Sequence, residues 1–159
     1  MIFGAFLLGG ILGLTGSFIP HYWERRRAKA SAAALTRAYI SGILEMETIR
    51  NHSALYEQNL AALRTGATTS VMKIYGSEDI IDEMQKIIMP QIGLLEPDIA
   101  RDVVMFGNML EGVRIDLRAM SRGEMDSLDT RTKIDILEKD LTLWREAQRK
   151  GKELINRLS

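Results

Sequence analysis

The chain begins with a continuous apolar run and continues as stripes of apolar residues at helical spacing. Its first twenty residues contain no charged side chain, and a cluster of mostly basic residues follows from Glu24 to Lys29. A helix over residues 2–19 would be about 27 Å long, close to the ~30 Å hydrocarbon core of a bilayer. The pattern therefore predicts a transmembrane anchor over residues 1–20.

The segment after this run, residues 21–29, has the composition of a membrane–water interface on its cytoplasmic side. Aromatic rings favour the headgroup region, and clustered basic residues resist translocation and attract anionic lipids. We therefore expect a single-pass protein of the inner membrane, with its N-terminus outside and residues 24–159 in the cytoplasm. The residues predicted to lie at this interface are Tyr22, Trp23, Arg25, Arg26, Arg27 and Lys29.

Two other interpretations of the first helix compete with an anchor. A signal peptide carries positive charge before its apolar run and a small-residue cleavage site after it. Here the charge follows the run, and Phe18, Ile19 and Pro20 stand at its end. A helix buried in the protein core is the second alternative, because five glycines lower the hydropathy of the run. The rest of the chain, however, offers no partner face of matching length.

Glycines repeat at helical spacing within the predicted anchor. Gly9 and Gly13 stand about one turn apart, and Gly16 lies near the same side of the helix. Small residues at this spacing allow the backbones of two transmembrane helices to approach closely. The pattern therefore favours self-association of the anchor through Gly9, Gly13 and Gly16.

Beyond the basic cluster, apolar residues recur in alternating steps of four and three, the spacing of helices with one buried face. Three such stripes predict long helices over about residues 30–65, 97–121 and 130–157, the first ending at Gly66, which can take a positive φ. Joined by short breaks, they pack most simply as antiparallel neighbours. We therefore expect an all-α, antiparallel bundle over residues 30–159. Its predicted core residues are Leu35, Tyr39, Met46, Ile49, Tyr56, Leu60, Val103, Phe106, Leu110, Val113, Leu117, Leu137, Leu141, Trp144 and Ile155.

Local residues mark the starts of the last two long helices. Pro97 suits a first helical turn, where its missing N–H is not needed, and Asp98 adds negative charge near the positive end of the helix dipole. Asp129 or Thr130 is suited to cap the N-terminus of the third long helix. These signals predict starts at about residues 97 and 130.

The segment between the first two long helices is the least regular part of the predicted bundle. Ser77, followed by two acidic residues, indicates the start of a short fourth helix over about residues 78–88, which should end before Pro90. Residues 91–95 should then lie across the bundle as a short packing element. A long excursion of this kind is where a bundle would present a recognition surface, because loops vary without disturbing the core.

Composition disfavours several classes of function. The chain has 21 basic and 21 acidic residues, and residues 24–29 hold four of the former and one of the latter, which leaves 17 against 20 elsewhere. A mildly acidic domain is a poor partner for nucleic acid. The chain contains no cysteine, which excludes disulfides, thiolate metal sites and cysteine nucleophiles.

The histidines do not fall into a metal or catalytic pattern. A di-metal helical bundle needs a glutamate three residues before a histidine, whereas Ile49 stands there before His52. His52 and Ser53 are sequence neighbours and so diverge on a helix, which disfavours a Ser–His nucleophile. No glycine-rich phosphate loop follows a strand. We therefore expect a protein that is not an enzyme and has no catalytic, cofactor or metal site.

One stretch of the chain resembles a pattern that recurs in small bacterial proteins of uncharacterised function. It reads IGLLEPDIARDVVMF over residues 92–106 and LEGVRIDL over residues 110–117, and the resemblance extends over about residues 76–118. Proteins of that kind tend to have an N-terminal membrane helix and a helical cytoplasmic region. The resemblance implies a bacterial origin, but it transfers no activity and no functional residue.

These patterns predict a membrane-anchored helical scaffold or subunit that binds protein partners, either a second copy or another subunit, at the cytoplasmic membrane face. An anchor would raise the effective concentration of the bundle for partners there. One alternative is a pore assembled through the glycine-rich helix, although that helix has no polar stripe to line a channel. Another is a sensor that binds a small ligand between the helices. Membrane lipid and protein are thus the expected partners.

Overall fold

The computed structural model describes the backbone of residues 3–66 and 85–159, and the side chains of residues 21–66 and 85–159. Every regular element within these ranges is a helix, so the protein is all-α. Residues 85–88 are also helical. The elements are α1 (Phe3–Arg50), α2 (His52–Arg64), the 3₁₀ helix η1 (Met89–Leu94), α4 (Pro97–Ser121) and α5 (Thr130–Arg157).

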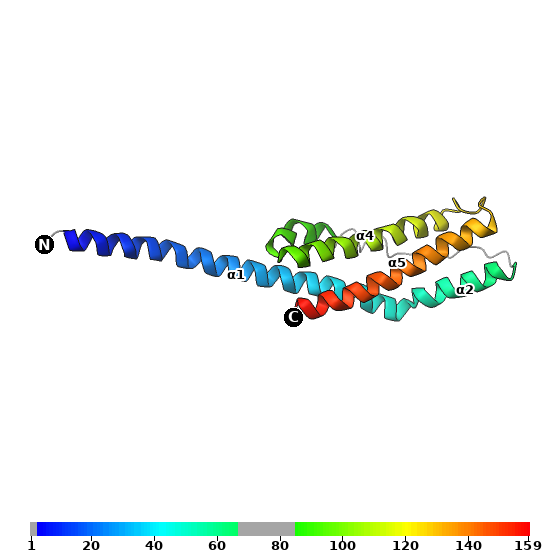
Figure 1. Ribbon diagram of the computed structural model, residues 1–159, viewed down its shortest axis with the longest axis horizontal. Coiled ribbons are helices and arrows are strands. Elements are labelled where there is room, and N and C mark those ends of the chain that lie inside the picture. Colours follow the sequence, from blue (N-terminus) through cyan, green and yellow to red (C-terminus); the bar gives the residue numbers. More distant parts are fainter. Residues whose placement is uncertain (1–2, 67–84) are drawn as a thin grey trace.

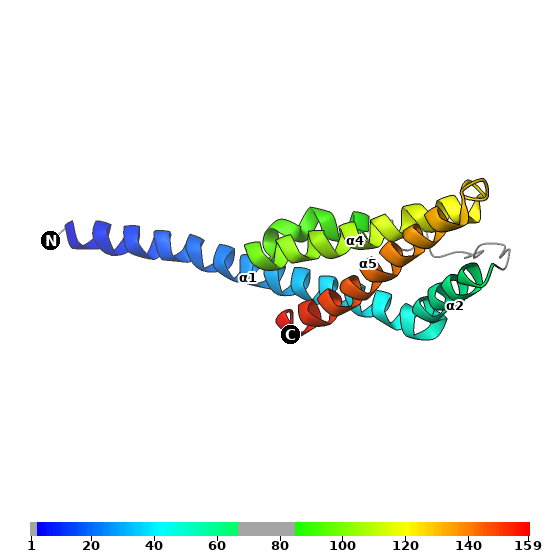
Figure 2. The same cartoon turned by 45° about the vertical axis from the view of Figure 1, so that its right-hand side comes forward.

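The helices form a bundle from which α1 projects (Figure 1). The first half of α1 extends beyond the other helices, and its second half joins them. α4 and α5 lie side by side and antiparallel, and α5 also contacts α1 and α2. Seen from a second direction, the N-terminal part of α5 runs between α4 and α2, and its C-terminal part crosses α1 (Figure 2). α5 is therefore the central packing element of the bundle.

α1 is a single helix of 48 residues that continues through Pro20. It starts far ahead of residue 30, where the predicted long helix begins, and at 1.5 Å per residue it is about 72 Å long. A proline inside a helix removes one backbone hydrogen bond and crowds the preceding turn, but a long helix can absorb this locally. No linker therefore separates the apolar run from the bundle.

The prediction of one helix over residues 30–65 is wrong at Asn51. This residue adopts the left-handed conformation, with φ 50° and ψ 49°, which ends α1 and starts α2 in a new direction. Asparagine is among the few residues other than glycine that tolerate this conformation. The Asn51 side chain makes no capping hydrogen bond. Instead, the Glu47 carboxylate accepts hydrogen bonds from the N–H groups of His52 (3.2 Å) and Ser53 (3.1 Å), in the first turn of α2.

The buried face of α1 is displaced from the predicted one. Tyr39 is buried, and Leu35 and Met46 pack against the core while partly exposed. The assignment of Ile49 to the core is wrong, because this side chain is 76% exposed. It lies in the last turn of α1, directly before the change of direction at Asn51. Within residues 21–50 of α1, the buried residues are Ala32, Thr36, Tyr39, Ile40, Ile43 and Glu47.

The other predicted core residues lie in or against one continuous core. Leu117 and Ile155 are partly exposed and pack against its buried members. The bounds of α4 and α5 coincide with the predicted ranges 97–121 and 130–157. The buried members of the predicted set on α2, α4 and α5 are Tyr56, Leu60, Val103, Phe106, Leu110, Val113, Leu137, Leu141 and Trp144.

Three helices of this core pack closely at Gly151 of α5. A Cβ atom at this position would lie 3.0 Å from Cε2 of Phe106 on α4 and 3.2 Å from Cγ2 of Ile40 on α1. Both neighbours are fully buried, at 0% exposure. The missing side chain of Gly151 thus allows α5 to pack closely against α4 and α1 at once.

The short helix predicted over residues 78–88 lies mostly outside the described residues. Directly after residues 85–88, η1 forms over part of the segment that is predicted to be a short packing element, with Pro90 in its first turn. A proline is accommodated at that position because the first N–H groups of a helix have no internal acceptor. Ile92 and Leu95 pack against the core, so η1 lies across the bundle and contacts α1 and α4.

Candidate functional site

The candidate membrane-facing segment is the part of α1 that precedes the first buried residue of the bundle, Ala32. Residues 21–31 are all exposed except Ala28, which is partly exposed. No other described helix lies beside this stretch in either view (Figures 1 and 2). At 1.5 Å per residue it is about 16 Å long. It therefore connects residues 1–20 to the bundle as a free-standing piece of helix.

Two large aromatic side chains are exposed on this segment. Tyr22 is 64% and Trp23 53% exposed, and their rings meet edge to face with their centres 6.5 Å apart. The Arg26 guanidinium lies 5.9 Å from the centre of the Trp23 ring, within range of a cation–π contact. Rings that are apolar in body and polar at one end suit a membrane–water interface. The predicted interface residues Tyr22, Trp23 and Arg26 are thus brought together.

The basic residues of the segment are spread over more than half of the helix circumference. At 100° per residue, Lys29 lies about 40° around the axis from Arg25, Arg26 about 100° and Arg27 about 200°. A helix that lies flat on a membrane needs one apolar face and one charged face. Basic residues spread this widely, with aromatic residues beside them, suit a helix that enters the interface end-on.

The predicted anchor, residues 1–20, lies outside the residues whose side chains the structure describes. Its backbone is helical from Phe3 onward. The predicted packing glycines Gly9, Gly13 and Gly16 fall in the same range. In residues 21–66 and 85–159, no helix combines the length and the hydropathy of a membrane-spanning segment.

A first buried polar cluster holds the junction between α1 and α2. The Ser53 hydroxyl donates a hydrogen bond to Oε1 of Glu47 over 2.8 Å, and Nδ1 of His52 lies 3.1 Å from Oε2 of the same carboxylate. The His52 ring packs edge to face against Trp144 of α5, with ring centres 5.5 Å apart. The Ser53 hydroxyl therefore bonds to Glu47 and not to His52, and the cluster stabilises the turn between the helices.

The protonation states of this cluster follow from its burial and its hydrogen bonds. Burial raises the pKa of Glu47, but the Ser53 N–H, the Trp144 side chain and the Ser53 hydroxyl stabilise the carboxylate and hold its pKa below the usual value. Burial lowers the pKa of His52 more strongly than the Glu47 charge raises it. The cluster thus favours an ionised Glu47 beside a neutral imidazole.

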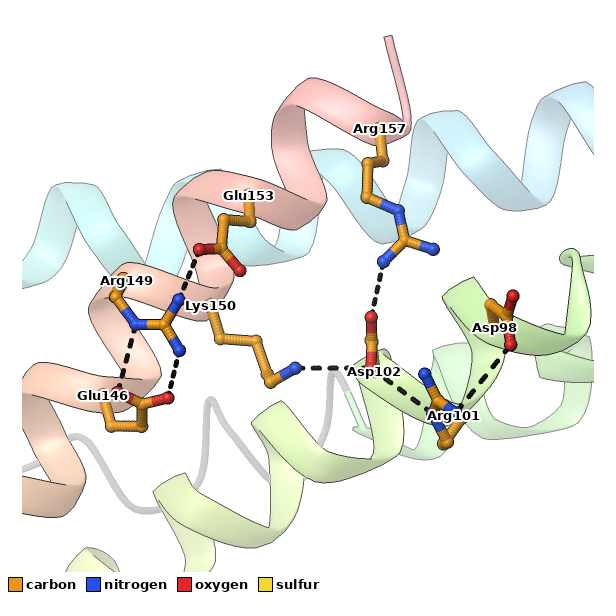
Figure 3. A network of polar contacts seen from close by, with 8 residues as sticks. All are labelled: Asp98, Arg101, Asp102, Glu146, Arg149, Lys150, Glu153 and Arg157. Carbon is orange, nitrogen blue, oxygen red and sulfur yellow. Dashed lines mark hydrogen bonds and ion pairs between the residues drawn. The ribbon is translucent and has the colours of Figure 1, made fainter.

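A second cluster is centred on Asp102 of α4, which sequence reasoning did not single out (Figure 3). Its side chain is 12% exposed, and it accepts hydrogen bonds from Arg157 over 2.5 Å and from Lys150 over 3.3 Å. Arg101 lies 3.6 Å from the same carboxylate. The hydrogen bond from Arg157 holds the pKa of Asp102 below its usual value, against the effect of burial. Asp102 thereby joins the N-terminal part of α4 to the C-terminal part of α5.

Beside this cluster, a row of exposed charges runs along α5 (Figure 3). Arg149 donates hydrogen bonds to Glu146 in the preceding turn and, over 2.5 Å, to Glu153 in the following one. Pairs of this kind on one helix surface stabilise it by about 0.2–0.5 kcal/mol each. They support the helix.

A third cluster lies where α2, α4 and α5 meet. The Tyr56 hydroxyl donates a hydrogen bond to Oδ2 of Asp140 over 3.4 Å, and the two residues are 0% and 1% exposed. The charge of Asp116 on α4 also acts on the Asp140 carboxyl. Burial and the charge of Asp116 raise the pKa of Asp140 to about 8. Burial, followed by the charge of Asp140, also raises the pKa of Tyr56.

Sequence reasoning placed Tyr56 in the core but did not single out the two aspartates. A signal was present, because Asp140 adjoins Leu141 on the predicted buried face of its helix. Across the described ranges, no group of three or more histidine or acidic side chains is placed to hold a metal ion. The cluster therefore places one buried carboxyl group beside one buried phenol, between α2 and α5.

Comparisons with known proteins do not assign a function to this chain. No protein-family model matches the chain, and no curated protein or solved structure is significantly similar to it.

Proposed function

We propose that this protein is a single-pass protein of the inner membrane, whose C-terminal helical bundle binds protein partners at the cytoplasmic face. The observation that carries the proposal is the continuity of α1. This helix leads from the uncharged run of residues 1–20, through the exposed aromatic and basic segment, into the bundle. An uncharged run of that length matches the thickness of a bilayer core, and the basic residues after it favour a cytoplasmic location for the bundle.

The shape of the molecule supports a scaffold or a subunit. Because α1 is uninterrupted between residue 20 and Ala32, the bundle would stand about 16 Å from the membrane surface without a flexible linker. α4 and α5 run broadly along the direction of α1 (Figure 1). The bundle would then extend away from the membrane and present its sides to neighbours confined to the same surface, where effective concentrations are high.

The polar clusters support a structural role for the interior of the bundle. Glu47 at the end of α1 caps the first turn of α2. Asp102 joins α4 to α5, and Asp140 joins α5 to Tyr56 of α2. Each connects side chains of two helices within the bundle. A second copy of the chain, or another subunit, is therefore the partner that we propose in preference to a small substrate.

The anchor can be tested by topology. A reporter that works only in the cytoplasm, fused after Ser159, should be active, and the protein should remain in the membrane fraction after an alkaline wash. Neutral substitutions at Arg25, Arg26, Arg27 and Lys29 should scramble or invert insertion, because these charges set the orientation. Neutral substitutions at four exposed basic residues of α5 should leave it unchanged. These control positions are Lys139, Arg145, Arg149 and Lys152. Periplasmic activity of the unmodified fusion, or recovery of the protein as a soluble species, would contradict the proposal.

Self-association can be tested separately through the glycines of the anchor. Replacing Gly9 and Gly13 with leucine should keep the protein in the membrane, because hydropathy rises, but should abolish a crosslinked dimer, because leucine side chains hold the backbones apart. Gly4→Leu with Thr15→Leu, on the opposite side of the helix, is the matched control and should retain the dimer. An unchanged dimer in the Gly9 and Gly13 variant would show that the bundle, and not the anchor, mediates dimerisation. A monomeric wild type would leave another subunit as the partner.

A further inference from the structure

Among the described elements, α2 packs mainly on one helix and is separated from α1 by one residue. Its contacts are concentrated on α5, and Asn51 alone stands between α1 and α2. We propose that Asn51 is a hinge at which α1 and α2 straighten into one helix, so that α2 leaves α5 of its own chain and packs on α5 of a second copy. The proposal rests on the part of the proposed function that names a second copy as partner. It does not require residues 1–20 to form an anchor.

The first argument is that straightening replaces hydrogen bonds at the hinge with equivalent ones. The Asn51 N–H already bonds to the Glu47 carbonyl over 2.7 Å, and the Leu55 N–H to the Asn51 carbonyl over 3.2 Å, both with the four-residue spacing of an α-helix. The N–H groups of His52 and Ser53 bond instead to the Glu47 carboxylate. In a straight helix they would bond to the carbonyls four residues earlier. The bent form is therefore held by one side chain, and the straight form by the backbone itself.

The second argument is the conformation of Asn51. Within the described part of the chain, it is the only residue other than glycine with a positive φ. An L-residue in this conformation is strained, and a straight helix would remove the strain. The Asn51 side chain is exposed and makes no capping hydrogen bond. Its own side chain therefore does not hold the bend.

The third argument is an apolar residue that the bent form leaves in solvent. In one continuous helix, Met46, Ile49, Tyr56 and Leu60 would fall within about 80° of one another around the axis. In the bent form Tyr56 and Leu60 are 0% and 4% exposed, whereas Ile49 is 76% exposed. The bend thus excludes a large apolar side chain from the stripe to which its spacing assigns it. The straight helix would return Ile49 to that stripe.

The surface that a released α2 needs is one that every copy carries. In the bent form the Tyr56 hydroxyl donates a hydrogen bond to Asp140 of α5, and Glu57 pairs with Arg145 at the exposed edge. A straightened chain on its own would expose the apolar residues of α2 and the part of α5 that they cover, at a cost in hydrophobic burial. The α5 of a second copy offers the same contacts, which makes exchange of an element a low-cost route to a dimer.

The length of the chain permits this exchange. α2 has 13 residues, so at 1.5 Å per residue its far end would move by at most about 39 Å when the hinge straightens. Residues 65–84 connect α2 to the next described helix, and at about 3.3 Å per residue their covalent reach is about 66 Å. α1, α4 and α5 can therefore stay together in one copy while α2 crosses to the other.

The test uses the full-length protein in mild detergent, with cysteines introduced into a chain that has none. Chains with Glu57→Cys and chains with Arg145→Cys, carrying tags of different size, are co-expressed and treated with a short thiol crosslinker. The two positions face each other across α2 and α5 and are 55% and 57% exposed. A crosslink between chains reports exchange, and a chain with both cysteines reports the bent form as a crosslink within one chain. Lys139→Cys, about 120° around α5 from Arg145, replaces Arg145→Cys as the control for general proximity.

In the wild-type background the crosslink within one chain should predominate, because the Glu47 cap holds the bend and exchange needs a second copy. Asn51→Ala disfavours the left-handed conformation and favours a helix, so it should raise the crosslink between chains at least about fivefold. Asn51→Gly tolerates the bend and should leave that crosslink at the wild-type level. Gln58→Ala, at an exposed position of α2, is the matched control for helix propensity alone.

Ile49→Gln separates exchange from a general loosening of the bundle. In the Asn51→Ala background it should lower the crosslink between chains, but alone it should leave urea unfolding nearly unchanged, because the side chain is already exposed. Glu47→Gln keeps the volume of the side chain and removes one acceptor oxygen, which gives a second route to the straight form.

The proposal is overturned if Asn51→Ala and Glu47→Gln both leave the crosslink between chains at the wild-type level. An equal rise for Gln58→Ala, or with the Lys139→Cys control, would also contradict it. Loss of the protein from the membrane fraction, by contrast, would count against the anchor and not against the exchange of α2.

Discussion

Replacing Phe106 with alanine should destabilise the bundle by about 3–5 kcal/mol, the cost of removing a large side chain from a well-packed core. Phe106 is 0% exposed, and its ring edge faces Gly151 of α5. The glycine has no side chain that could move into the space, so a cavity should remain. The measurement is urea unfolding of the full-length protein in detergent, followed by circular dichroism.

The matched control is Val104→Ala on the same helix. Val104 is 37% exposed, so its truncation removes little buried surface and should cost well under about 1 kcal/mol. An unchanged unfolding midpoint for Phe106→Ala would mean that this face of α4 does not point into a core. That result would contradict the packing of α4 on α5 described above.

Replacing Gly151 with leucine should also destabilise the bundle, because it adds volume to the core instead of removing it. A Cβ atom there would already lie 3.0 Å from Phe106 and 3.2 Å from Ile40, so a full side chain must force α5 away from α4 or α1. Overpacking of this kind typically costs about 1–3 kcal/mol, and more where several helices meet. The measurement is the same urea titration.

Two comparisons sharpen this prediction. Gly42→Leu on α1 should be neutral or slightly stabilising, because a Cβ there meets no atom within 4 Å and glycine is the weaker helix former. Combining Phe106→Ala with Gly151→Leu should cost less than the sum of the two single changes, since the leucine can occupy part of the cavity. Strict additivity would show that the two positions are not in contact.

Local sequence signals were sufficient for the bounds of α4 and α5. Asp129 caps α5 as the sequence indicates, with its side chain accepting a hydrogen bond from the Thr132 N–H over 3.1 Å. Pro97 stands in the first turn of α4, and Gly66 follows α2 with a φ of 78°. These ends are set by residues within one turn of each other. Neighbours in the sequence therefore determine them without help from the rest of the fold.

Local sequence signals do not predict the break between α1 and α2 at Asn51. The apolar stripe continues in phase across it, from Met46 to Tyr56, so periodicity alone favours one straight helix. A left-handed asparagine is unfavourable by itself and needs compensation from its surroundings. That compensation includes Glu47, which caps α2 and lies beside Trp144 of α5. The direction of α2 is therefore decided by packing against α5.

By itself, the sequence determined the helical class, the bounds of the last two long helices, most of their buried faces and the exposed aromatic and basic segment of α1. Each depends on residue type and local spacing. The tertiary structure alone decided which charged residues are buried, because ionisable groups enter a core only when partners satisfy them. Arg157 lies 55 residues from Asp102, and Asp140 lies 84 residues from Tyr56. Pairings over such separations exist only once α5 has packed between its neighbours.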